Sequence, residues 1–179
     1  MKLSSETQIE CLFNLDDMPR FNVVILYEDG RAGRRAKRLY DKLNHELEDE
    51  CDFNLKLWNF QVLAIPEFGE SAMEAAAQAD LVIVSLHGQA GIPAEIKEWI
   101  EALTGQIIDR PPALVALLGK PKAGGGTAAS TLAYLSSVAN RTGIDFFAHT
   151  VFSDINTVLA MYYYENMKLS EIAALLRTD

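Results

Sequence analysis

The sequence predicts a single doubly wound α/β domain, in which helices cover both faces of a parallel β-sheet. Two observations lead to this prediction. From Phe21 onward, β-prone segments alternate regularly with helical ones, an alternation typical of parallel strands joined by right-handed crossovers. In addition, 179 residues with 49% hydrophobic content suffice for one domain with a sizeable core and are too few for two comfortable ones.

The predicted strands are rich in aliphatic and aromatic residues and span residues 22–27, 53–58, 81–86, 113–118 and 144–149. The first, third and fourth are nearly unbroken apolar runs, which is typical of interior parallel strands that are buried on both faces. The second and fifth are more polar and are expected at the edges. A five-stranded parallel sheet of order 2-1-3-4-5 satisfies this pattern, and that order is the flavodoxin-like arrangement of a three-layer sandwich.

The predicted helices fill the intervals between the strands. Leucines at positions 39, 43 and 47 form an apolar stripe over residues 33–50, and residues 66–79 are rich in Ala and Glu. Pro93 opens the next helix, and Thr127 caps another that Gly143 ends. A last helical segment is expected from Asp154. Residues 1–20 are interpreted as a polar leader, and residues 21–179 as one flavodoxin-like α/β domain.

Composition excludes several classes of protein. The formal net charge of −9 argues against nucleic acid as a general partner, because phosphate backbones require a clustered basic surface. We expect no membrane association and a cytoplasmic location, since the start has no secretory signal and the apolar runs are far shorter than the ~20 residues of a membrane span. Cys11 and Cys51 are expected to be reduced thiols, and their spacing does not indicate a metal site.

In this type of sheet, ligands bind beyond the carboxyl ends of the strands, at the switch point between the first and third strands. The first loop there is strongly basic, since five of the chain's 16 Lys and Arg residues fall within residues 28–38. Basic side chains oppose the positive end of a helix macrodipole at a cost of ~0.3 kcal/mol or more each. The loop therefore suggests an anion site made by Gly30, Arg31, Gly33, Arg34 and Arg35. The alternative is a solvated basic face that pairs with Glu28, Asp29 and Asp41.

Two further loops converge on the same switch point. In residues 87–93, His87, Gly88 and Gln89 are candidates to contact a planar ligand; the alternative is an ordinary loop before Pro93. His87 alone is a weak acid–base signal, because no Ser or Cys nucleophile pairs with it. The loop 119–127, with Gly119 and Gly124 as candidates, is interpreted either as a flap over a ligand or as a surface loop. Its spacing does not match a P-loop.

Two stretches of the chain resemble the NADPH-dependent FMN reductases of the flavodoxin-like superfamily. Residues 79–85 followed by 92–101 are similar to that family's strand, loop and Ile-Pro segment, and a Gly-rich loop follows the fourth predicted strand. The resemblance implies FMN as a possible cofactor and hydride chemistry carried by the flavin. Arg31 matches the family's arginine, but Asp29 and Arg34 stand where the family places phosphate-binding hydroxyls. Ala90-Gly91 replaces the family's aromatic-Asn pair.

A second resemblance concerns response-regulator receiver domains, which share this strand order. Tyr27-Glu28-Asp29 looks like the acidic pair of a receiver. However, Ser85-Leu86-His87 stands where the phospho-accepting Asp is required, and Ala148-His149-Thr150 stands where the Lys is required. This resemblance therefore implies at most a pseudo-receiver that is not phosphorylated. Residues 168–176 are similar to the first helix of a helix-turn-helix and are interpreted as a packing or dimer helix.

The sequence leaves three functions open. The first is a non-enzymatic flavodoxin-like signalling or interaction module that has lost its cofactor site and binds a protein partner or a second copy. The second is a flavin- or nucleotide-binding protein, such as an NAD(P)H-dependent FMN reductase-like oxidoreductase, with an anionic small molecule held at the switch point. The third is a hydrolase or transferase that uses Glu28 and Asp29 near a metal ion.

Overall fold

The computed structural model describes residues 18–87, 91–106, 110–119 and 126–150. Within them, all strand pairings are parallel and join five strands in the order β2-β1-β3-β4-β5, which confirms the predicted order. The strands are Arg20–Tyr27 (β1), Asp52–Asn59 (β2), Leu81–Leu86 (β3), Ala113–Leu118 (β4) and Phe146–Thr150 (β5).

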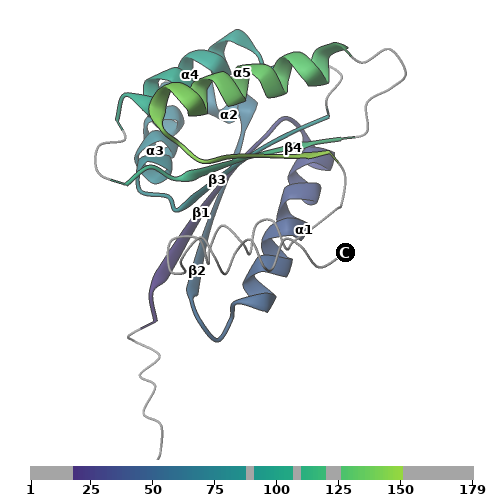
Figure 1. Cartoon of the computed structure of the whole chain (residues 1–179). Helices are drawn as coiled ribbons and strands as arrows, with labels where there is room; N and C mark the ends of the chain where they lie inside the picture. The colour runs from purple at the N-terminus through teal and green to yellow at the C-terminus, as the bar shows by residue number, and fades with distance from the viewer. Residues whose placement is uncertain (1–17, 88–90, 107–109, 120–125, 151–179) are drawn as a thin grey trace, which may run out of the picture.

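The described helices lie in two layers, one on each face of the sheet (Figure 1). They are Gly30–Glu46 (α1), Phe60–Leu63 (α2), Pro66–Ala77 (α3), Ala94–Thr104 (α4) and Gly126–Thr142 (α5). Helix α1 covers one face of the sheet, and α2 to α5 cover the opposite face (Figure 1). The core is divided accordingly: buried residues of α1 pack in one cluster, and those of α3, α4 and α5 pack in another.

Alternation along the central strands supplies both clusters. In β1, Val24 and Leu26 face the layer of α3 and α4, whereas Val23 and Ile25 face α1. These four side chains are at most 2% exposed, and every residue of β3 is buried. Each such aliphatic side chain contributes roughly 1.5–3 kcal/mol when fully buried. Hydrophobic burial therefore fixes β1 and β3 side by side, and the loops that follow them become neighbours.

The bounds of several elements differ from the predicted ones, for local reasons. Helix α1 begins at Gly30 rather than at residue 33, because the side chain of Asp29 caps it, and it ends at Glu46 rather than at residue 50. The short helix α2 was not predicted; the side chain of Asn59 caps it by accepting a hydrogen bond from the N–H of Gln61. Gly143 ends α5 as expected, with a φ of 70° that favours glycine.

Other expectations concern segments that the structure does not describe, namely most of the polar leader and the helical segment expected from Asp154. Cys51 is a buried free thiol, and Cys11 lies outside the described residues. None of the helices in the described ranges has the length and apolar character that a bilayer span requires.

Candidate functional site

The carboxyl ends of β1, β3 and β4 bring the starts of three loops together at the switch point of the sheet. The backbone N–H of Glu28 donates to the carbonyl of Ser85 at 3.0 Å, which extends the pairing of β1 with β3. The N–H of Gly119 donates to the carbonyl of Leu86 at 2.8 Å, which joins the end of β4 to β3. The loops after these strands therefore start within hydrogen-bonding reach of one another.

Asp29 caps the helix that leaves this site. Its Oδ1 accepts hydrogen bonds from the backbone N–H groups of Arg31 and Ala32, both at 2.9 Å. These N–H groups belong to the first turn of α1, where no intrahelical acceptor is available and where the macrodipole favours an anion. The N–H of Ala32, and then that of Arg31, lowers the pKa of the Asp29 carboxyl by stabilising its ionised form. The protein thus places its own carboxylate at the anion-binding end of α1.

His87 connects the second loop to the same carboxylates. Its Nε2 lies 2.9 Å from Oδ2 of Asp29, and its backbone N–H donates to Oε2 of Glu28 at 2.7 Å. The side-chain amide of Asn59 donates in turn to the backbone carbonyl of Glu28 at 3.4 Å. Both carboxylates of the first loop therefore accept hydrogen bonds from protein groups, and His87 is oriented toward them.

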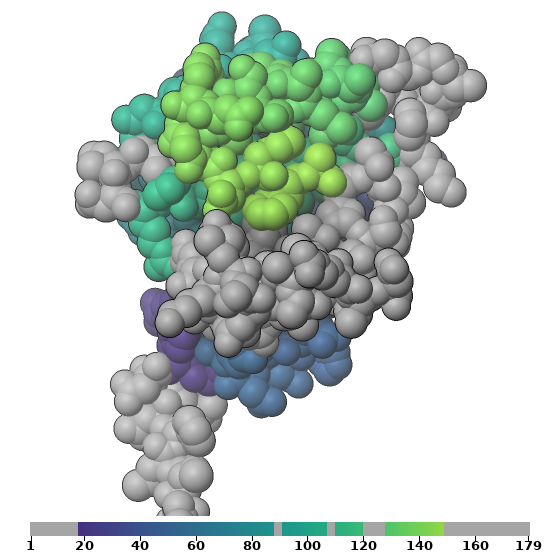
Figure 2. Space-filling view, in the orientation of Figure 1, coloured from purple at the N-terminus to yellow at the C-terminus, as the bar shows by residue number. Residues whose placement is uncertain are grey.

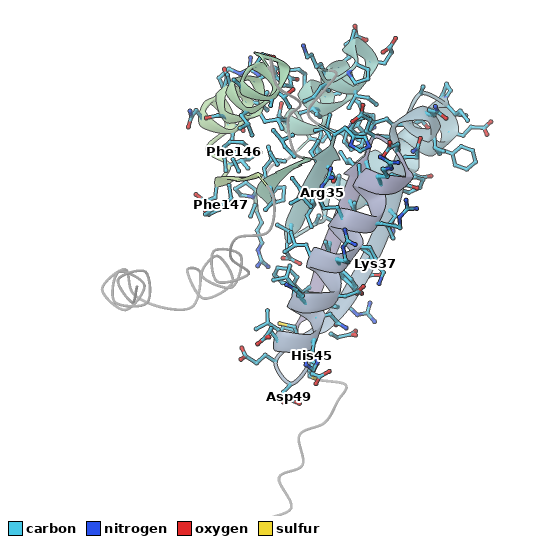
Figure 3. The ribbon with its side chains drawn as sticks, turned by 90° about the vertical axis from the view of Figure 1, so that its right-hand side faces the viewer. Arg35, Lys37, His45, Asp49, Phe146 and Phe147 are labelled. Carbon is cyan, nitrogen blue, oxygen red and sulfur yellow. The ribbon has the colours of Figure 1, made fainter. Side chains whose placement is uncertain are left out.

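Arg35 lies on the inner side of α1. Figure 3 shows it on the side of α1 that faces the strands, whereas Lys37 lies on the outer side. One terminal nitrogen of Arg35 donates to the carbonyl of Leu86 at 2.5 Å and lies 3.5 Å from the hydroxyl of Ser85. Burial lowers the pKa of its guanidinium, and the charges of Asp29 and Glu28 act in the opposite direction. Arg35 therefore links α1 to the exit of β3.

Ser85 is a site residue that the sequence analysis did not select. It is fully buried, and its hydroxyl donates to the backbone carbonyl of Ala32 at 2.9 Å, so it holds the first turn of α1 against β3. The available signal was its position, since a hydroxyl at the end of an otherwise apolar buried strand needs a hydrogen-bond partner there.

Two glycines at the site allow protein groups to approach closely. A Cβ on Gly119 would lie 2.9 Å from the carbonyl oxygen of His87 and 3.1 Å from a terminal nitrogen of Arg35. A Cβ on Gly33 would lie 3.0 Å from the ring of Tyr27. At both positions the space that a larger side chain would need already holds groups of the protein.

The structure brings together four of the ten predicted site residues. Gly33, Arg35, His87 and Gly119 make the contacts described above. Gly30, Arg31 and Arg34 lie in the first turns of α1 and are exposed; an Arg34 nitrogen would be 3.5 Å from a Cβ on Gly30. The remaining candidates, Gly88, Gln89 and Gly124, lie outside the described residues.

The described parts of the site contain no arrangement typical of a metal centre. No group of three or more His, Cys, Asp or Glu side chains in these ranges is placed to hold a metal ion. Glu28 and Asp29, the acidic pair considered for metal-dependent chemistry, both accept hydrogen bonds from N–H groups of the chain. In this arrangement they serve to hold loops together.

No protein-family model matches the chain, and no curated protein is similar to it in sequence. Among solved structures, it is similar to a flavodoxin of Streptococcus pneumoniae, with 14% identity over 86% of this chain and 91% of that chain and a TM-score of 0.49. A short-chain flavodoxin associated with a PDU bacterial microcompartment is 12% identical over 74% and 82%, with a TM-score of 0.47. The Trp repressor binding protein of Bacillus subtilis is 14% identical over 88% and 99%, with a TM-score of 0.43. At these values the strand order itself, rather than any one neighbour, establishes the flavodoxin-like fold.

Replacing Arg35 should lower the free energy of unfolding more than replacing its exposed neighbour, Arg34. We expect Arg35→Met to lower the free energy of unfolding by about 1–2 kcal/mol, because it removes a charge-assisted hydrogen bond to Leu86. Arg34→Met is the matched control: Arg34 is exposed, and its loss should change stability by at most about 0.5 kcal/mol. Urea denaturation of both variants measures the difference, and equal effects would contradict the role given to Arg35.

The cap at Asp29 should make stability depend on pH in the acid range. A carboxyl whose pKa is lowered by folding stabilises the native state above its ordinary pKa of 3.8, and this contribution is lost as the pH falls through the lowered value. Asp29→Asn keeps an oxygen for the cap but cannot ionise. The stability advantage of the wild-type protein over Asp29→Asn should therefore be larger at pH 5 than at pH 2, as measured by urea denaturation. An advantage that does not change over this range would show that ionised Asp29 is not favoured by the fold.

Proposed function

We propose that this protein is a non-enzymatic flavodoxin-like signalling or interaction module that does not hold a flavin phosphate at its switch point. The observation that carries the proposal is the capping of α1 by Asp29. Its carboxylate accepts the N–H groups of Arg31 and Ala32, which are the donors that an anionic ligand would require at this helix end.

Electrostatics opposes a second anion at the same place. A phosphate charge about 4 Å from the Asp29 carboxylate would be repelled by roughly 1 kcal/mol in water-like surroundings, and by about 4 kcal/mol at an effective dielectric constant of ~20. The carboxylate of Glu28 adds to this repulsion, since both carboxylates hydrogen bond to His87. A flavin phosphate would have to displace Asp29 and leave two carboxylates beside it.

The arginines of the loop differ in how well they could offset the repulsion between a phosphate and these carboxylates. Arg35 donates to the carbonyl of Leu86, so its guanidinium is committed to the protein. Arg31 and Arg34 are exposed, where their interaction with an anion is weakened by solvent. A flavin-dependent oxidoreductase, the alternative, therefore depends on these two side chains to hold the phosphate while Asp29 leaves the helix end.

An FMN titration tests the proposal. We expect millimolar FMN to leave the melting temperature of the wild-type protein unchanged. In the double variant Glu28→Gln/Asp29→Ser, the serine still caps α1 while both charges are removed. Because each 1.4 kcal/mol is a factor of ten in affinity, removal of the repulsion should tighten FMN binding by about tenfold or more.

The matched control is Asp41→Ser, which removes an exposed carboxylate from the same helix away from the site and should gain no affinity. A rise in the wild-type melting temperature with FMN, or FMN found by native mass spectrometry in freshly purified protein, would contradict the proposal. A double variant no better than the wild type would show that the carboxylates are not what excludes the ligand.

A further inference from the structure

Two strands at one edge of the sheet present apolar side chains on the face that α1 occupies. Val115 and Leu117 of β4 belong to the buried cluster of that face, and Phe147 of β5 packs against it; these three side chains form the β4–β5 face. Val115 is 0% exposed and Leu117 is 5% exposed. Helix α1 packs against β1, β2 and β3, and no other described helix lies on this side of the sheet (Figure 1). The burial of the β4–β5 face therefore requires cover from a part of the chain outside the described ranges.

The opposite side of these two strands is already covered. Helix α5 packs against both β4 and β5, and its buried residues Leu135, Val138 and Ala139 belong to the cluster of that side. Figure 2 shows α5, in green, directly beside the last described strand, in yellow-green. A further helix after β5 can therefore cover these strands only on the side of α1.

Length and connection indicate which segment can provide this cover. The gaps between the described ranges span three to six residues, which is too short for a helix along two strands. Residues 1–17 precede β1, and β3 separates β1 from β4 in the sheet. Residues 151–179, by contrast, follow directly after β5. Because β5 is parallel to the other strands, a helix that follows it closely has to run back along β5 and β4.

The sequence after β5 has the pattern of a helix with one apolar side. Ile155, Val158, Leu159 and Tyr162 recur at the i, i+3, i+4, i+7 spacing that predicts an amphipathic helix, and together they form the apolar stripe. A helix over residues 154–165 would be about 18 Å long at 1.5 Å per residue. The six residues of β4 span about 20 Å. The predicted helix and the strand therefore match in length.

We propose that residues 154–165 form a helix whose apolar stripe packs on the β4–β5 face of the same chain. Removal of apolar side chains from water on both partners drives the contact. The β4–β5 face is thus occupied by the chain itself and is not a surface for a partner protein. The inference does not rest on the proposed function, because it concerns this side of the sheet and not the switch point.

Methyl NMR of the full chain tests the contact directly. With the methyl groups of Ile, Leu and Val labelled, we expect nuclear Overhauser effects that join Val158 or Leu159 to Val115 or Leu117. A mixture of labelled and unlabelled chains separates effects within one chain from effects between two chains. The absence of these effects would overturn the proposal. Their presence only between chains would also overturn it, because a second copy would then cover the β4–β5 face.

A pair of matched variants provides the second test. Val158→Asp/Leu159→Asp should abolish these effects and shift the methyl resonances of the β4–β5 face, because unpaired carboxylates are not buried against apolar side chains. The control Thr157→Asp/Ala160→Asp adds the same charge on the opposite side of the predicted helix and should leave both unchanged. If the first variant does not fold, Leu159→Ala replaces it, and its methyl shifts should be confined to the β4–β5 face and its neighbours. Equal shifts in the stripe variant and the control would contradict the proposal.

Discussion

The first turn of a helix presents backbone N–H groups that have no partner within the helix, and in this fold that turn lies at the switch point of the sheet. Those N–H groups must bond to water, to a ligand or to a side chain. In this protein the side chain is Asp29, which takes the N–H groups of both Arg31 and Ala32. An anionic ligand at the switch point would therefore have to compete with Asp29 for these N–H groups.

The remaining contacts of the site are arranged around this carboxylate. His87 approaches Asp29 through its ring and Glu28 through its backbone, which fixes the loop after β3 to the loop after β1. Beneath them, Ser85 and Arg35 join the first turns of α1 to the end of β3. Gly119 has no side chain, so β4 can end close to His87 and Arg35. The loops are thus held by contacts within the chain.

The sequence predicted features that depend on local residue patterns better than features that depend on contacts between distant residues. The strand order followed from the unbroken apolar character of residues 81–86 and 113–118, because burial on both faces is visible in composition. The capping by Asp29 is also local, yet the helix was expected to start three residues late, at residue 33 rather than at Gly30. The inward turn of Arg35 was not predictable, since it depends on a carbonyl 51 residues away whose position the β1–β3 register sets.

The two faces of α1 carry different kinds of side chain. Its inner face packs Ala36, Tyr40 and Leu43 against the sheet and carries Arg35, whereas its outer face carries charges that the helix itself does not favour. In the sequence alone, the arginines of the basic loop form one group. The structure separates them into one that supports the fold and others that face outward.

The contacts of the site depend on the chain's own carboxylate, which occupies the anion-binding end of α1. The most direct measurement is a high-resolution crystal structure of the protein grown at neutral pH in a high concentration of phosphate. We expect that Asp29 still accepts hydrogen bonds from the N–H groups of Arg31 and Ala32 in that crystal and that no phosphate is bonded to them. A phosphate bonded to those N–H groups, with the Asp29 side chain turned away, would contradict it.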